Sequence, residues 1–360
     1  MKEFKNISKR NQHGIFWGLT ILSIKILGNV PQFVELVYAR NIYPVIAVVN
    51  RWFASLFSFS IGDLLYFWGF AYLIYQLLQF LIHIKNPWQH LERISIFLLK
   101  TIWIFYLSWG VNYFREPLAE NLHLSTKKYT ANQLIKVTDS LIVRTNRLQK
   151  QLTGNDSLAV EIPYSTENIL RKTPEGYRQI ERYIHTKYSV PCIKTSLFSK
   201  QISYMSVSGY LNPFTGEAQV NKFYPKVFLP DIASHEVAHQ LGFAPENEAN
   251  FLGYLAAIHH PDLYFNYSGY IDALYYFLVE LRHYDPKIYK TYLKKLHKGV
   301  LKNFIEAQIF HKKYRFPIDF SSTYDSYLKL NNQKSGIHSY NEMVQLVIAY
   351  ELQKENNLSR

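Results

Sequence analysis

A pair of histidines four residues apart is the part of this sequence best suited to chemistry. Residues 235–239 read His-Glu-Val-Ala-His. On a helix, side chains at positions i and i+4 lie on one face, so His235 and His239 can bind the same metal ion. Glu236 then lies beside that ion and can accept a proton from a water whose pKa zinc lowers to about 7. The motif predicts a hydrolase with one Zn²⁺ per chain, held by His235 and His239, and with Glu236 as general base.

A third metal ligand is expected on the helix that follows the motif. Pro245 opens a segment that contains two carboxylates, Glu246 and Glu248. Glu246 and Asn250 are four residues apart and share a helix face, so one can bind the metal while the other orients a ligating histidine. We favour Glu246 as the third ligand and keep Glu248, which lies on a different face, as the alternative.

The flanking residues indicate how the motif is positioned. Pro230 and Asp231 are expected to begin its helix, with Asp231 as the N-cap, and Gly242 is expected to end it. Short alternating runs between residues 198 and 220 predict a β-hairpin or small sheet, in which residues 202–220 either bind a peptide as an added strand or form an ordinary hairpin. Helical spacing is found over residues 130–152 and 165–188, with Thr130 and Ser165 as caps, and again after residue 230.

Hydrolysis of an amide also needs a group that stabilises the developing oxyanion. Tyr267, Tyr270 and His260 follow the predicted metal-binding helices and are the candidates for this role. The chain has 29 tyrosines, so a packing role is the alternative for each of them.

The first third of the chain contains three apolar segments. Residues 64–84 include no Lys, Arg, Asp or Glu and are long enough for a helix to cross a bilayer. Residues 94–114 carry one charge, Lys100, close to one end. Residues 14–30 are shorter, carry Lys25, and are either a third span or a signal-like segment. We therefore predict a membrane domain over residues 1–114 with about three transmembrane helices, followed by a globular domain over residues 115–360.

Basic residues predict how the membrane domain is oriented. The N-terminus carries Lys2, Lys5, Lys9 and Arg10, and the short loop after the second span carries Lys85 and Arg93. The positive-inside rule makes both segments cytoplasmic, so three spans place the globular domain outside the cytoplasmic (inner) membrane. Prolines and charges interrupt the segment between the first two spans, which indicates either helices at the membrane interface or a connecting loop.

The amino-acid composition limits the classes of partner that the chain is expected to bind. The formal net charge of +13 suits nucleic acid or an anionic membrane surface, but no helix-turn-helix, RNP or zinc-finger pattern accompanies it. We expect a lipid bilayer and a protein or peptide substrate as partners, and no nucleic acid. Cys192 is the chain's one cysteine, which excludes an internal disulfide and a multi-cysteine zinc site.

Two resemblances extend these predictions. The motif followed by Glu246-x-x-Ala-Asn250 resembles the Glu-zincin peptidases, which implies Glu246 as third ligand, although the connection of six residues from His239 is short for that group. The runs FSFSIGDLLY (57–66), SGYLNPFTGEAQVN (208–221), HEVAHQLGFAPENEANFLGYL (235–255) and YSGYIDALYY (267–276) are similar to a bacterial multi-pass membrane family, domain of unknown function 3810. That family pairs membrane helices with a HExxH domain, and the similarity implies no substrate.

The predicted fold is mostly α: transmembrane helices followed by an α+β zincin-like domain with a small sheet and a helical C-terminal part. The predicted function is that of a membrane-anchored zinc metallopeptidase. The alternatives are a zinc amidase acting on cell-wall or lipid-linked substrates, and a non-catalytic scaffold or sensor that keeps zinc for structure. Structural zinc sites usually have four protein ligands. The sequence offers three ligands and a carboxylate in the position of a base, which favours an enzyme.

Overall fold

The computed structural model describes residues 2–82, 87–125, 127–315, 329 and 340–358. It is mostly helical, with one three-stranded sheet among the described residues. Two compact units are present: residues 1–116 together with 212–216, and residues 117–211 together with 217–360. The predicted boundary between residues 114 and 115 lies two residues from the end of the first unit's main segment.

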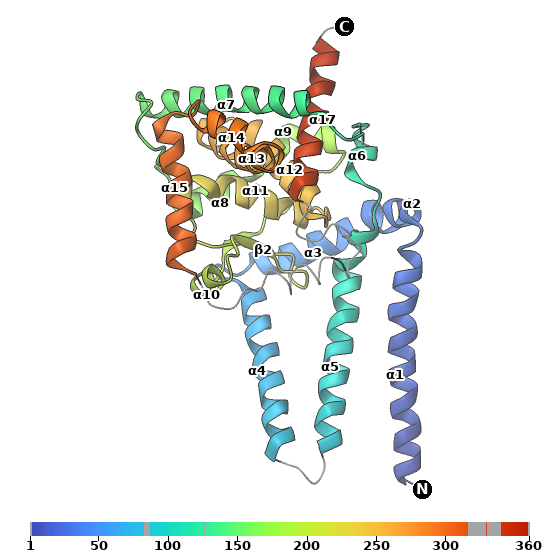
Figure 1. Cartoon of the computed structure of the whole chain (residues 1–360). Coiled ribbons are helices and arrows are strands. Elements are labelled where there is room, and N and C mark those ends of the chain that lie inside the picture. The colour runs from blue at the N-terminus through green and yellow to red at the C-terminus, as the bar shows by residue number, and fades with distance from the viewer. Residues whose placement is uncertain (1, 83–86, 126, 316–328, 330–339, 359–360) are drawn as a thin grey trace. The chain divides into compact units, whose positions relative to one another are not determined.

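The first unit consists of helices. They are α1 (Lys2–Leu27), α2 (Pro31–Phe33), the π-helix η1 (Val34–Ile42), α3 (Tyr43–Ser55), α4 (Ile61–Ile82), α5 (Pro87–Ser108) and the 3₁₀ helix η2 (Gly110–Phe114). Within this unit α1, α4 and α5 run alongside one another, and α3 lies across one end of them (Figure 1).

By length and hydropathy, α4 is the one described helix that can cross a membrane by itself. Residues 14–26 and 31–55 together form a bent pair that meets the same criterion, with a bend of 98°. The predicted span 64–84 coincides with α4, although its last two residues and Lys85 lie outside the described part of the chain. The predicted span 94–114 is not one continuous helix, because α5 ends at Ser108 and η2 follows.

The second unit surrounds its sheet with helices. In chain order its elements are α6 (Leu118–Asn121), α7 (Ala131–Thr153), α8 (Thr166–Lys172), α9 (Pro174–Ile184), β1 (Ile193–Thr195), α10 (Ser199–Tyr204), β2 (Gly209–Leu211), β3 (Ala218–Val220), η3 (Lys226–Phe228), α11 (Leu229–Gln240), α12 (Glu246–Ile258), α13 (Leu263–Tyr284), α14 (Pro286–Leu293), α15 (Lys298–Lys313) and α17 (Tyr340–Leu358).

Local signals explain several of these boundaries. Thr130 and Gln133 form a reciprocal capping box at the start of α7, and Ser165 caps α8, so both predicted caps are confirmed. The predicted helix over residues 165–188 is divided, because Pro174 begins a new helix, α9. Proline lacks an N–H and is favoured at the first helical position, which accounts for the division.

The sheet has the strand order β1-β3-β2. Strand β2 pairs antiparallel with β3, so the predicted hairpin is confirmed, and β1 adds a parallel strand with Ile193 opposite Ala218. The helix α10 occupies part of the segment in which only strands were predicted.

Helix α11, which contains the His-Glu-x-x-His motif, lies in the core of the second unit and packs against α12, α13, β2 and β3. Val237 and Ala238 on α11 and Phe251 and Leu252 on α12 are completely buried. The interior around the motif is therefore densely packed, and its helix is not a surface helix.

Candidate metal centre

The start of α11 differs from the prediction. The 3₁₀ helix η3 continues directly into α11, whose N-cap is Phe228, so Asp231 lies in the first turn and is not the cap. Asp231 is buried, and its backbone N–H donates to the hydroxyl oxygen of Ser268 on α13 at 3.1 Å. A hydroxyl from a neighbouring helix thus satisfies one of the N–H groups that a helix start leaves unpaired.

The end of α11 agrees with the prediction. Gly242 has a φ of +83°, a left-handed conformation that costs glycine little, and it directly follows the last turn. The N–H of Gly242 donates to the carbonyl of His239 at 3.0 Å, and the N–H of Phe243 to that of Ala238 at 3.1 Å. This closure reverses the chain within a few residues and allows α12 to begin at Glu246.

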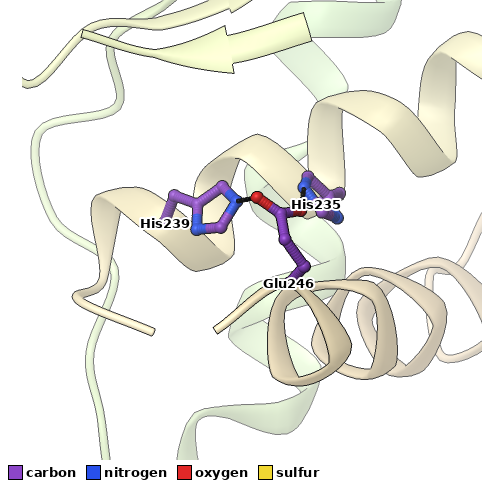
Figure 2. A group of neighbouring side chains, drawn as sticks. All are labelled: His235, His239 and Glu246. Carbon is purple, nitrogen blue, oxygen red and sulfur yellow. Dashed lines mark ion pairs between the residues drawn. The ribbon is translucent and has the colours of Figure 1, made fainter. Parts of the chain in front are cut away.

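His235, His239 and Glu246 converge. Nε2 of His235 lies 3.4 Å from Oε2 of Glu246, and Nε2 of His239 lies 3.7 Å from Oε1 of Glu246. One ligand atom from each residue lies within 4.8 Å of the other two. Figure 2 shows the carboxylate of Glu246 reaching from α12 to the two imidazoles on α11. Ligand atoms about 2.0–2.1 Å from a tetrahedral zinc ion lie roughly 3.4 Å apart, so these separations fit such an ion.

The ring of His239 is oriented for binding a metal. Its Nδ1 lies 2.8 Å from the carbonyl oxygen of Phe243, which accepts only from a protonated ring nitrogen. In the neutral imidazole the proton is then on Nδ1, and the lone pair of Nε2 faces Glu246.

Gly253 allows α12 to approach α11 closely. A Cβ at this position would lie 2.9 Å from the backbone nitrogen and 3.1 Å from the Cα of His235. Gly253 is seven residues after Glu246 and therefore on the same helix face. Sequence reasoning missed this role, although the spacing from Glu246 was a signal that could have revealed it.

Glu236 is held beside the two histidines with one free oxygen. It is buried, and its Oε2 forms no hydrogen bond with any described residue. Burial raises the pKa of Glu236 to about 7, the two imidazoles oppose this rise, and the charge of Glu246 adds to it. Strand β2 passes close by, because a Cβ on Gly209 would lie 2.6 Å from Oε1 of Glu236. An orphaned buried carboxylate oxygen of this kind indicates a functional position.

The charged groups of the site favour the binding of a cation. Burial alone would lower the pKa of His235, but hydrogen bonding to Glu246 and the charges of Glu236 and Glu246 outweigh it and raise the pKa to about 9. Burial would raise the pKa of Glu246, but His239 and His235 outweigh it and hold that pKa well below its usual range. Glu246 is therefore ionised at neutral pH and available to bind a metal.

The two carboxylates of α12 have different surroundings. Glu246 contacts the imidazoles, whereas Oε1 of Glu248 accepts a hydrogen bond from the backbone N–H of Leu118 at 2.7 Å. The side chain of Asn250 lies near His235 and adds to the rise in the pKa of that imidazole, and its Nδ2 lacks a hydrogen-bond partner among the described residues. The structure thus brings together Glu246 and Asn250, the pair predicted to share a face, and places Glu248 in contact with α6.

Next to the site lies an acidic pair that sequence reasoning missed, formed by the buried Asp231 and the half-buried Asp272. The carboxyl groups of Asp231 and Asp272, on α11 and α13, lie close enough for each to shift the pKa of the other. Burial raises the pKa of both, that of Asp272 to about 6, and His235 lowers the pKa of Asp272. No local pattern could have revealed this pair, because its two residues are about 40 positions apart.

The three residues suggested for oxyanion stabilisation have other contacts. Tyr267 is completely buried and donates to Oδ1 of Asn303 at 2.9 Å. Tyr270 contacts the guanidinium of Arg144. His260 is buried, stacks on Phe265 and accepts the N–H of Asp262 at 2.9 Å. These contacts are typical of packing residues.

Comparison with known proteins establishes the family. The profile described as "Protein of unknown function (DUF3810)" matches residues 38–348, so the chain belongs to this family, and the predicted membership of this family is confirmed. No curated protein and no solved structure matches the chain.

Proposed function

We propose that this chain is a membrane-anchored zinc metallohydrolase, and specifically a metallopeptidase. The observation that carries the proposal is the convergence of His235, His239 and Glu246 beside a buried glutamate with an unpaired oxygen. Two imidazoles and one carboxylate are a common ligand set for catalytic zinc.

The number of ligands supports catalysis over a structural role. Among the described residues, the group that can hold a metal has three members, His235, His239 and Glu246. Structural zinc sites are usually closed by four protein ligands, whereas catalytic sites keep a fourth position open for water or substrate. Zinc, when bound, supplies Lewis acidity that polarises a carbonyl and lowers the pKa of water to about 7.

The chain's own residues supply the proton transfers. Glu236 accepts a proton from the attacking water and donates it to the leaving amine, as a general base and then a general acid. Burial keeps its pKa near neutrality, which suits both steps. The carbonyl of Phe243 holds the ring of His239, so this imidazole does not need to reorient, and Asn250 lies near His235 on the same side of α12 as Glu246.

We further propose that the first unit anchors the enzyme in the cytoplasmic membrane through α1, α4 and α5. Helix α4 supports this most directly, because it can span a bilayer and its side chains are largely exposed. The basic N-terminus and the segment of sequence that carries Lys85 and Arg93, the second of which lies in α5, then face the cytoplasm, and the catalytic unit lies outside it.

The decisive experiment compares full-length wild-type protein with Glu236→Gln, both reconstituted with zinc in nanodiscs. Each is tested on a peptide library and on cell-wall fragments, whose peptide amides the same site could cleave. We expect Glu236→Gln to bind zinc normally and to lose at least about 100-fold in kcat, the usual minimum for removing a general base.

Glu248→Gln is the matched control, since it makes the same change on the neighbouring helix, and it should retain activity. Wild-type turnover in Glu236→Gln would refute the mechanism. Cleavage of cell-wall fragments but not of library peptides would identify an amidase in place of a general peptidase.

A further inference from the structure

Helix α3 buries its one charged residue, Arg51, and exposes a row of large apolar side chains. Its buried face consists of Tyr43, Ala47, Arg51 and Ala54. The opposite face, with the residue that follows the helix, forms what we call the apolar stripe: Val45, Val49, Trp52, Phe53 and Leu56, each between 52% and 63% exposed. Their spacing, i, i+4, i+7, i+8 and i+11, forms one continuous stripe along the helix.

The preceding segment repeats this pattern. Phe33, Leu36 and Ile42 are exposed, whereas Glu35 is buried and bound by two arginines. Nε of Arg115 lies 2.8 Å and Nε of Arg40 3.0 Å from the carboxylate of Glu35. A surface in contact with water shows the reverse arrangement, because soluble proteins rarely expose a large contiguous apolar patch. Burying charge while exposing apolar side chains is favourable where the surroundings are hydrocarbon.

The direction of α3 indicates which part of a membrane it contacts. Residues 31–55 are bent by 98° from residues 14–26, so α3 runs nearly perpendicular to α1. Within the first unit, Figure 1 shows α3 lying across the ends of helices that run side by side. Its 13 residues extend about 20 Å, which is less than the roughly 30 Å of a bilayer's hydrocarbon core. Trp52 in the stripe suits the headgroup region, where tryptophan is enriched.

We propose that α3 is an interfacial helix, lying in the plane of the membrane with the apolar stripe against lipid acyl chains. We assign the lipid bilayer as the partner of the apolar stripe, because only five residues separate α3 from α4, the helix that can span a bilayer. The ion pairs of Glu35 with Arg40 and Arg115 then lie on the side of residues 33–56 that faces away from lipid. This inference rests on the proposed membrane anchoring and adds a second mode of contact to it.

Spin-label depth measurements on the full-length protein in liposomes test the proposal. Cysteine is introduced at one position at a time in a Cys192→Ala background and labelled with a nitroxide. Relative accessibility to oxygen and to a water-soluble nickel chelate then gives the depth of each label. The positions are Val45, Val49, Phe53 and Leu56 in the stripe, Phe70 in α4 as membrane control, and Val143 in α7 as aqueous control.

We expect the four stripe labels to contact lipid at one shallow depth, with a spread of no more than about 5 Å, about the pitch of one helical turn. A helix crossing the membrane would instead place Val45 and Leu56 about 16 Å apart in depth, at 1.5 Å per residue, and that result would overturn the proposal. Stripe labels as accessible to nickel as Val143 would also overturn it, and would assign the stripe to a protein partner or to solvent.

The Phe70 label separates this inference from the proposed anchoring. If the Phe70 label lies deep in lipid while the stripe labels are exposed to water, the proposed anchoring stands and the interfacial position of α3 is refuted. If Phe70 is itself exposed to the nickel chelate, the anchoring fails, and the interfacial helix is refuted with it. Each labelled variant must unfold at the wild-type temperature to be included.

Discussion

Replacing Gly253 with alanine should weaken zinc binding without changing any ligand. The new Cβ would lie 2.9 Å from the backbone nitrogen of His235, and ordinary contacts begin near 3.4 Å, so α12 must move away from α11 by about 0.5 Å. Glu246 is on the same face of α12 and moves with it. Metal–ligand distances tolerate only about 0.2 Å. We therefore expect zinc affinity to fall at least tenfold, which is about 1.4 kcal/mol.

The assay is competition with a chromophoric chelator, using full-length protein in nanodiscs. Gly269→Ala is the control, because its Cβ would lie 2.7 Å from the Cβ of Ala257 at the interface of α12 with α13. Both changes should cost about 1–3 kcal/mol of stability through overpacking, but only Gly253→Ala should weaken zinc binding substantially. Wild-type zinc affinity in a folded Gly253→Ala protein would refute the argument that this close approach positions Glu246.

Three further predictions concern charge. Glu246→Gln should lose zinc, whereas Glu248→Gln should keep zinc and only have a lower unfolding temperature. Metal analysis of both variants checks this, and zinc loss confined to Glu248→Gln would reverse our choice of the third ligand. Because the pKa of His235 is raised to about 9 without metal, zinc must displace a proton to bind, so zinc affinity should rise about tenfold per pH unit from pH 6 to 8. Zinc titration at a series of pH values measures this dependence, and an affinity that does not change with pH would contradict it. Burial raises the pKa of Asp231 well above its usual value, so the metal-free protein loses stability as pH rises above about 4, where the unfolded chain releases its proton. An amide at this position needs no proton to stay neutral, so Asp231→Asn should raise the unfolding temperature at pH 8 and match wild type near pH 4. An equal shift at both pH values would exclude linkage to this pair.

Sequence reasoning located the features that depend on neighbouring residues. The paired histidines, the shared face of Glu246 and Asn250, the caps at Thr130 and Ser165, and the turn at Gly242 all follow from helix geometry and backbone preference. The same local reasoning misplaced the start of α11, because η3 runs into it and moves the start upstream of Pro230.

Features that depend on packing between distant segments could not be predicted in this way. The role of Gly253 requires knowing that α12 crosses α11 at His235, and the proximity of Gly209 to Glu236 requires knowing where β2 lies. The end of α5 at Ser108 is also invisible to hydropathy, because the apolar composition continues through the backbone change at Trp109, where φ is −157°. Apolar composition indicates a membrane segment but does not fix where its helix ends.

The central claim is that His235, His239 and Glu246 hold one zinc ion. It is tested most directly by the metal content of purified full-length protein, wild type beside His239→Ala, measured after removal of loosely bound metal. About one zinc per chain in the wild type and almost none in His239→Ala is the predicted result. Wild-type protein that binds no divalent metal, or a His239→Ala protein that retains a full equivalent, would contradict the account.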